Sequence, residues 1–305
     1  MSFKKTMSLL IIRAGALGDT LMLMPLIDAL NKKHVITILG RQPGIGYLEP
    51  FVNLCIDIER GGWHRLFTGE MKGGLKLPVA DCVAAFIADP DNIVSENLRY
   101  LMPESRIDFF RPFPEPESKI HVALYMACAL QSAGIPIDCR SAFDDALKKP
   151  VMQAHRIFGE KIVLHPGSGS KGKNYSPDFW YDLLSAIKME GFSRARDTCL
   201  LLGPAEEDIG TAFSKIAEEH NVEIFFCPEK EELLSILNSA CIYIGHDNGI
   251  THLAAMLGVN TIALFKGSSI DQWRPLGPAV KVIRPDMSPD LILKKVVREC
   301  RRLLS

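Results

Sequence analysis

Several hallmarks of other protein classes are absent from this sequence. Its eight cysteines include no CxxC pair, and most stand in apolar segments. That usage argues against a zinc site or a disulfide framework and predicts buried thiols in a reducing compartment. Lys and Arg total 35 against 36 Asp and Glu. Because no basic surplus is present to attract a polyanion, nucleic acid is not an expected partner.

Long apolar runs are absent as well. The longest stretches without a charged side chain, residues 120–137 and 248–265, are each broken by residues such as His and Gly. A membrane helix needs ~20 strongly apolar residues, so no membrane span is expected. The apolar run that follows Lys4 and Lys5 is too short for the core of a signal peptide. We therefore expect a cytoplasmic protein.

The chain contains two successive series of strands and helices. Its 305 residues are about twice the ~150 that suit one core, and 47% of them are hydrophobic and 23% charged, as in globular proteins. Short apolar runs alternate with helical patterns in both halves, which predicts an α/β fold with two mostly parallel, Rossmann-like sheets. The expected strands are 9–13, 35–39, 54–58, 82–87, 107–110, 161–165, 198–202, 223–226, 241–245 and 261–265.

The predicted domains are residues 1–150, including an aperiodic linker at 134–150, and residues 151–288. Ligands of such sheets bind beyond the carboxyl ends of the strands, so function is sought in the loops that follow them. A last helix at 289–304 exposes basic residues. This face is either simply solvated or in contact with anionic lipid headgroups. Those basic residues are Lys294, Lys295, Arg298, Arg301 and Arg302.

The first of these loops runs from Arg13 through Gly18 to Asp19. It is rich in glycine, but Arg13 occupies the place of the first glycine of GxGxxG, and no acidic residue ends the second strand. A nicotinamide or flavin cofactor is therefore not expected. Asp19 either caps the following helix or accepts a proton from a bound hydroxyl, and one carboxylate can do both.

The second domain opens with a loop in which residues 167–173 match GxxxxGK. Asn174 lacks the hydroxyl that would bind magnesium, and Pro177 starts the next helix too late, so a P-loop is not expected. Small residues such as Ser168 still let an anion approach the backbone amides, and Lys173 adds a positive charge. The alternative is a plain surface loop.

Two later loops carry further polar residues. Glu206 either begins a helix or accepts hydrogen bonds from a ribose diol. Residues 245–252 place Asp247, Asn248, Gly249 and His252 at a helix N-terminus that can hold a phosphate.

No metal site is predicted from these residues. The spacing of His246, Asp247 and His252 matches no standard metal site. Asp89-Pro90-Asp91 spells DxD, a metal-diphosphate motif in one class of glycosyltransferases, but a turn is the favoured interpretation.

Four motifs follow one another along the chain: GDxxMxxP from Gly18, KxYxP from Lys173, GPxE from Gly203 and HDNGxxHLAA from His246. In this order they resemble glycosyltransferase family 9, the ADP-heptose:lipopolysaccharide heptosyltransferase family. The resemblance covers most of the chain. It implies the GT-B fold, with two Rossmann-like domains facing across a cleft, the acceptor on the N-terminal side and the sugar nucleotide on the C-terminal side. It also implies that the helix at 289–304 packs back on the first domain.

The resemblance assigns roles to particular residues. Asp19 would be the catalytic base, Lys173 would neutralise the departing diphosphate, and Glu206 would hold the ribose. Other donor-binding positions would be Gly18, Ser168, Asp247, Asn248, Gly249 and His252.

The implied reaction inverts the anomeric carbon and uses neither a metal nor another cofactor. It moves a heptose from ADP-heptose to a lipopolysaccharide-core or related lipid-linked glycan, with possible peripheral contact at the inner membrane face. This chain departs from the family at Asn248, where Thr is common, and carries no family signature in residues 43–116.

Two alternatives remain open at this level. The first is a GT-B-fold sugar-nucleotide epimerase or hydrolase, and the second is a non-catalytic protein that binds a nucleotide sugar. The presence of both a candidate base, Asp19, and a candidate phosphate lysine, Lys173, argues against the non-catalytic protein.

Overall fold

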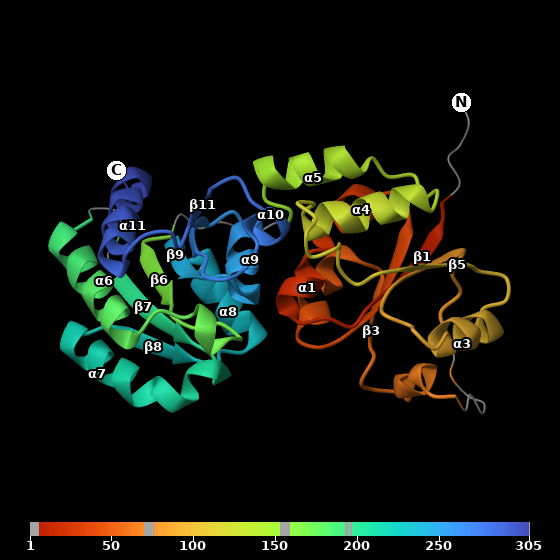
Figure 1. The fold of residues 1–305 in the computed structure, drawn as a ribbon, viewed down its shortest axis with the longest axis horizontal. Helices are drawn as coiled ribbons and strands as arrows, with labels where there is room; N and C mark the ends of the chain where they lie inside the picture. Colours follow the sequence, from red (N-terminus) through yellow and green to blue (C-terminus); the bar gives the residue numbers. More distant parts are fainter. Residues whose placement is uncertain are drawn as a thin grey trace. The chain divides into compact units, whose positions relative to one another are not determined.

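The computed structural model describes residues 6–69, 75, 77–152, 159–192, 195 and 197–304. The chain divides between Asp145 and Ala146 into two compact units, each built around its own parallel sheet (Figure 1). The boundary falls inside a helix, a few residues before the predicted division at residue 150. This α/β architecture confirms the predicted fold class.

The first unit contains a five-stranded sheet in the order β3-β2-β1-β4-β5, with every pair parallel. Leu9–Ile12 of the central strand are at most 1% exposed, because helices and loops cover both faces of the sheet. The strands are β1 (Ser8–Arg13), β2 (Val35–Gly40), β3 (Leu54–Asp57), β4 (Cys82–Phe86) and β5 (Arg106–Phe110).

The helices of the first unit differ from the prediction in two places. The expected single helix after Asp19 is two short helices, because Pro25 has no N–H to donate and starts a new helix. The expected linker contains helix α5, which buries Cys139, Ala142 and Ala146 at helical spacing. The helices are α1 (Leu17–Leu21), α2 (Met24–Leu30), α3 (Ile93–Leu101), α4 (Val122–Ser132) and α5 (Cys139–Lys148), with 3-10 turns at Gly44–Tyr47, Glu49–Phe51 and Trp63–Phe67.

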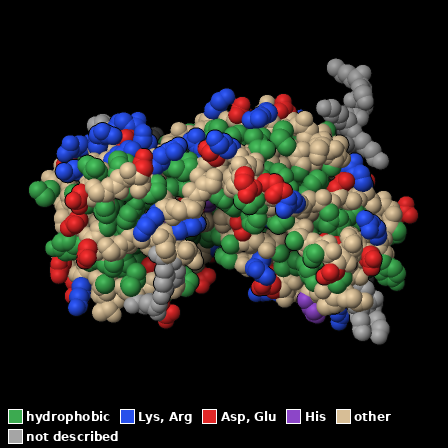
Figure 2. Space-filling view, viewed as in Figure 1, with side chains coloured by type: hydrophobic (Ala, Val, Ile, Leu, Met, Phe, Trp, Pro, Cys, Tyr) green, Lys and Arg blue, Asp and Glu red, His purple; other side chains and the backbone are tan. Residues whose placement is uncertain are grey.

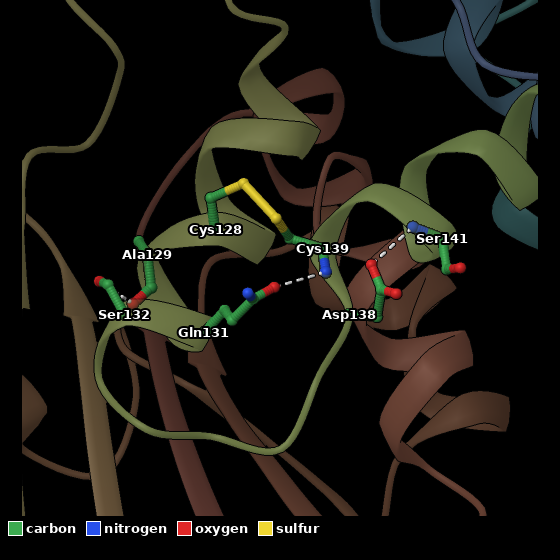
Figure 3. Close-up of a disulfide and its surroundings, with 7 residues drawn as sticks. All are labelled: Cys128, Ala129, Gln131, Ser132, Asp138, Cys139 and Ser141. Atoms are coloured by element: carbon green, nitrogen blue, oxygen red, sulfur yellow. Dashed lines mark hydrogen bonds between the residues drawn. A yellow bond between two sulfur atoms is a disulfide. The ribbon is translucent and has the colours of Figure 1, made fainter.

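The prediction that the cysteines are buried thiols is wrong for Cys227, which is exposed, and for one pair that is not free. Cys128 of α4 and Cys139 of α5 form a disulfide, with their Cα atoms 5.0 Å apart (Figure 3). The turn between the two helices is also held by Gln131, whose side-chain oxygen accepts a hydrogen bond from the Cys139 amide at 2.9 Å. The sequence did not reveal this pair because the fold of the helical hairpin, rather than a short Cys spacing, brings the two residues together.

The second unit contains a six-stranded parallel sheet in the order β11-β10-β9-β6-β7-β8. Strand β11 was not predicted. The strands are β6 (Lys161–His165), β7 (Asp197–Leu202), β8 (Glu223–Phe226), β9 (Ala240–His246), β10 (Asn260–Leu264) and β11 (Val280–Ile283). The helices are α6 (Pro177–Glu190), α7 (Gly210–His220), α8 (Lys230–Asn238), α9 (Gly249–Met256), α10 (Ile270–Trp273) and α11 (Pro289–Leu304), with 3-10 turns at Lys171–Lys173 and Pro204–Ile209.

The final helix, α11, belongs to the second unit. Its apolar residues join the buried cluster that also contains Trp180 and Leu183 of α6 and Ile242 of β9. The apolar stripe of α11 is therefore covered within its own unit, and packing of this helix on the first domain stays a prediction. The apolar residues of α11 in this cluster are Ile292, Val296, Val297, Cys300 and Leu304.

None of the helices in the described part of the chain is long and apolar enough to cross a membrane.

Candidate functional site

Asp19 lies at the carboxyl end of β1, in the first turn of α1. Its Oδ2 accepts a hydrogen bond from the Ala16 amide at 3.0 Å and so caps the helix. A Cβ on Gly15 would lie 2.5 Å from the Asp19 Cβ, which explains the glycine at this position. The side chain is half-buried, and Gly18 lies beside it in the same turn. The structure therefore shows the capping role, and the proton-accepting role stays a prediction.

Arg13, the last residue of β1, is a feature of this edge that the sequence did not reveal. It is only 2% exposed, and one guanidinium nitrogen donates to the Pro112 carbonyl at 2.7 Å. The guanidinium also lies over the ring of Phe113, 4.5 Å from its centre. Burial lowers the pKa of Arg13, and this is opposed by the nearby Asp19 and Tyr125.

In the second unit, Lys173, Asp247 and His252 meet at the carboxyl ends of β6 and β9. Lys173 Nζ lies 3.3 Å from Asp247 Oδ2, and His252 Nε2 lies 3.5 Å from Asp247 Oδ1. Burial by itself would raise the pKa of Asp247, but His252, Ser268 and Lys173 outweigh it and leave the pKa lowered. The edge therefore holds an ionised, buried carboxylate with a lysine beside it.

Asn248 and Gly249 begin helix α9. The Asn248 side chain accepts from the Thr251 amide at 3.0 Å and donates to the Gly167 carbonyl at 2.7 Å. It therefore caps α9 and ties that helix to the loop after β6. Ser168 is similarly engaged, since its hydroxyl lies 2.6 Å from the Asn174 side-chain oxygen. Both side chains order the loops, and their contact with a donor stays a prediction.

Glu206 follows the neighbouring strand β7 and is 1% exposed. Its Oε2 accepts from the Gly203 amide at 2.7 Å, whereas its buried Oε1 has no hydrogen-bond partner within the described structure. Burial raises the pKa of Glu206, partly offset by the Gly203 amide. A Cβ on Gly167 would lie 2.0 Å from the Glu206 carboxyl carbon, so only glycine leaves room for this carboxylate.

A buried polar network beneath the loops was not predicted. His165 Nδ1 lies 2.7 Å from the Tyr243 hydroxyl, which lies 3.1 Å from the Thr251 hydroxyl. Burial and the neighbouring His246 lower the pKa of His165 to about 3, so its ring is neutral. His165 and Tyr243 lie in strands and look like core residues in the sequence, yet through Thr251 they help to fix the N-terminus of α9.

Two motifs considered for metal binding have other roles here. His246 Nε2 accepts from the Tyr175 amide at 3.0 Å. Asp89 accepts from the Val94 and Ser95 amides at 3.1 and 2.8 Å and so caps α3. Among the described residues, no group of three or more His, Cys, Asp or Glu is arranged to hold a metal ion.

The predicted residues thus fall into two groups. One group follows three adjacent strands, in the sheet order β9-β6-β7. Ser168 and Lys173 follow β6, Glu206 follows β7, and residues 247–252 follow β9. They share the carboxyl edge of the second sheet and surround the N-terminus of α9. Gly18 and Asp19 stand at the corresponding edge of the first sheet, beyond β1. Both edges are where parallel sheets bind ligands.

Comparison with solved structures shows the same fold over the whole length. The chain is similar to Escherichia coli heptosyltransferase WaaC with ADP, with 15% identity, 96% of this chain and 99% of that chain covered, and a TM-score of 0.66. It is similar to a glycosyl transferase family 9 protein from Veillonella parvula DSM 2008, with 14% identity, coverage of 100% and 99%, and a TM-score of 0.68. The E. coli ADP-heptose lps heptosyltransferase II matches with 16% identity, coverage of 98% for both chains, and a TM-score of 0.66.

No curated protein matches the sequence. The model of glycosyltransferase family 9 (heptosyltransferase) matches residues 105–301, well over half of the chain. Together with the two parallel sheets and the similar heptosyltransferase structures, this match confirms the expected family and the GT-B fold. The chain belongs to glycosyltransferase family 9 and is a glycosyltransferase.

Proposed function

We propose that the protein transfers a heptose from ADP-heptose to a hydroxyl group of a lipopolysaccharide-core or related glycan, with inversion of the anomeric carbon. The observation that carries the proposal is the cluster of Lys173, Asp247 and His252 beside the N-terminus of α9. A lysine and helix amides are what a departing diphosphate needs. The similar WaaC structure contains ADP, which supports an adenine nucleotide.

The proposed chemistry is a single displacement. Asp19 accepts the proton of the acceptor hydroxyl while the oxygen of that hydroxyl bonds to the anomeric carbon, and the bond from that carbon to the diphosphate oxygen breaks. ADP leaves with the additional negative charge, which Lys173 and the α9 amides stabilise. Asp247 holds Lys173 in place before the donor binds, and the diphosphate then takes over as the partner of the ammonium group.

Glu206 is proposed to hold the ribose. Its free Oε1 can accept a hydrogen bond from a ribose hydroxyl, but the carboxylate is packed against Gly167. Donor binding therefore requires the loop at 166–170 to move away from Glu206. This loop is joined to α9 through the hydrogen bond from the Asn248 side chain to the Gly167 carbonyl. Its movement would therefore also shift the N-terminus of α9, where the diphosphate is proposed to bind.

We propose that the reaction uses neither a metal nor another cofactor. Lys173 and the amides of α9 supply the positive charge that a metal ion would otherwise give to the leaving group. Transfer should consequently continue at an unchanged rate after exhaustive treatment with EDTA. Loss of transfer that returns when magnesium or manganese is added would overturn this part of the proposal.

The acceptor is proposed to be lipid-linked, with the protein in peripheral contact with the inner membrane face. Figure 2 shows Lys and Arg side chains gathered over α11. Arg301 pairs with Glu190 and Arg302 with Glu299. Three further cations of this helix, Lys294, Lys295 and Arg298, are not in any ion pair seen among the described residues. Anionic lipid attracts such residues by about 1 kcal/mol each.

The test is to incubate the protein with ADP-heptose, with and without a heptose-free lipopolysaccharide core, and to follow ADP and the sugar products. The proposal predicts ADP release that depends on the acceptor and equals the heptose transferred. Release of free or altered sugar without an acceptor would favour an epimerase or hydrolase. Donor binding without turnover of any acceptor would favour a non-catalytic protein.

A further inference from the structure

A second lysine, Lys266, stands at the same edge of the second sheet as Lys173. It follows strand β10, which is hydrogen-bonded to β9 and therefore borders the loop that carries Asp247. The two strands are in register at their carboxyl ends, where Leu264 pairs with His246 and the Asp247 amide donates to the Leu264 carbonyl at 3.2 Å. Lys266 thus comes two residues after the point at which this loop is fastened to β10.

The Lys266 ammonium contacts the segment that directly follows Lys173. Its Nζ donates a hydrogen bond to the Asn174 carbonyl at 3.2 Å and lies 5.3 Å from the centre of the Tyr175 ring. That ring is itself held in place, because it is stacked on His246 with ring centres 5.4 Å apart. Lysines from the loops after β6 and β10 are therefore joined through one short stretch of chain.

The charge of Lys266 is not offset by a carboxylate. Lys173 lies beside Asp247, so these two charges largely cancel in the ligand-free protein. Within the described part of the chain, Lys266 contacts a neutral carbonyl and an aromatic ring, and it forms no ion pair. Its side chain is half-buried, so water and salt screen its charge less than that of an exposed lysine. Burial lowers the pKa of His246 to about 4, and the charge of Lys266 acts in the same direction.

A nucleoside diphosphate sugar is matched to such a cation. Both of its phosphates are negatively charged, and the departing nucleoside diphosphate carries one negative charge more. Lys173 has to exchange the Asp247 carboxylate for the phosphate, whereas Lys266 exchanges only a neutral carbonyl. Because a hydrogen bond from an ammonium group to a phosphate is stronger than one to a carbonyl, the second exchange favours the bound donor.

From this geometry we infer that Lys266 binds the diphosphate of the donor as a second cation, in addition to Lys173. A phosphate oxygen replaces the Asn174 carbonyl as the acceptor of its hydrogen bond. The inference rests on the proposed transferase function and adds to it a residue that binds the leaving group. Lys266 supplies the net positive charge of the site, because Asp247 offsets the charge of Lys173.

Calorimetric titrations of the intact protein with ADP, inorganic pyrophosphate and adenosine test this directly. Pyrophosphate contains the diphosphate without the nucleoside, and adenosine contains the nucleoside without the diphosphate. Lys266→Gln should raise the Kd for ADP and for pyrophosphate at least about tenfold, because a charge-assisted hydrogen bond is lost, and should leave the Kd for adenosine unchanged.

Two further variants separate the charge from the fold. Lys266→Arg keeps the charge and should retain most of the affinity for both anions. Lys215→Gln makes the same charge change as Lys266→Gln, at an exposed position of helix α7, and should bind all three ligands like the unmodified protein. Unchanged Kd values for ADP and pyrophosphate in Lys266→Gln would overturn the inference. So would a loss that is equally large for adenosine, or one that Lys266→Arg does not restore, because those patterns indicate a structural defect.

The transfer assay distinguishes this inference from the proposed function. Lys266→Gln should raise the KM for ADP-heptose about tenfold and leave the KM for the acceptor unchanged. If transfer occurs but Lys266→Gln changes neither the Kd for the anions nor the donor KM, the inference fails while the proposed function stands. If Lys266→Gln weakens both anions as expected but no acceptor is glycosylated, the inference stands and the proposed function fails. Failure of the unmodified protein to bind either anion would overturn both.

Discussion

Replacing Lys173 by Gln removes the cation proposed to meet the diphosphate, with little change in side-chain volume. In the ligand-free protein, the lysine is 3.3 Å from Asp247, and its side chain is 35% exposed. Solvent screens such a pair, so its loss should lower the free energy of unfolding by no more than about 1 kcal/mol. His252 still partners the Asp247 carboxylate in the variant.

The catalytic effect should be much larger than the effect on stability. A charge-assisted hydrogen bond to the donor contributes about 1.5–3 kcal/mol to binding, and removing one group that stabilises charge in the transition state typically costs about 10²–10³ in kcat. We therefore expect kcat/KM to fall by at least about 10², with a weaker Kd for ADP by calorimetry. A loss of activity much larger than the loss of stability would show that Lys173 acts in catalysis and not only in folding.

A matched control is available on strand β6, which precedes the loop that carries Lys173. Lys161 begins β6, at the end of the strand opposite Lys173, and lies 3.5 Å from both Asp197 and Glu223. Lys161→Gln makes the same charge change away from the carboxyl edge, so its kcat/KM should match that of the unmodified protein. If Lys173→Gln loses less than about fivefold in kcat/KM, or no more than Lys161→Gln does, the role given to Lys173 is wrong.

Four further predictions follow from the same contacts. Asp19→Asn should lower kcat by about 10²–10⁴ while the calorimetric Kd for ADP-heptose stays the same, and an unchanged kcat would exclude Asp19 as the base. Gly167→Ala should weaken donor binding and lower the free energy of unfolding by about 1–3 kcal/mol, because the new Cβ meets the Glu206 carboxyl; unchanged urea unfolding would contradict this. Burial lowers the pKa of His165 to about 3 and of His246 to about 4, so on acidification both histidines are protonated in the unfolded chain before they are protonated in the folded one. Between pH 7 and pH 5 the free energy of unfolding should therefore fall by about 2 kcal/mol per histidine. A urea midpoint that rises on acidification would refute the sign. Reversing Lys294, Lys295 and Arg298 to Glu should abolish co-sedimentation with phosphatidylglycerol vesicles, whereas reversing the exposed Lys32 and Lys33 should not, and equal binding of both variants would refute contact through α11.

The strands of both sheets were predictable because most are buried on both faces and appear as continuous apolar runs. The missed strand β11 is only partly buried and contains Lys281, so it lacks such a run. Helix α5 was assigned to a linker because its polar residues hide a narrow stripe of small apolar ones.

The grouping of the candidate residues was predictable because each of them stands in a loop that follows a strand. Lys173, Glu206 and Asp247 come after three strands that proved to be adjacent, so they share one edge. The sequence did not show that Asn248 and Ser168 use their side chains to hold the loops together. It also gave no signal for Arg13, because burial of a guanidinium under Phe113 depends on a contact between residues distant in the chain.

The central claim is that the carboxyl edge of the second sheet binds the nucleotide of ADP-heptose, and a melting-temperature comparison tests it most directly. At 100 times the Kd, a ligand adds about 2.7 kcal/mol to the free energy of unfolding, which raises the melting temperature by a few degrees. We predict that shift with ADP-heptose, a much smaller one with UDP-, GDP- and CDP-sugars, and loss of the shift in Lys173→Gln. A larger shift with a uridine or guanosine sugar, or a full shift in Lys173→Gln, would contradict the claim.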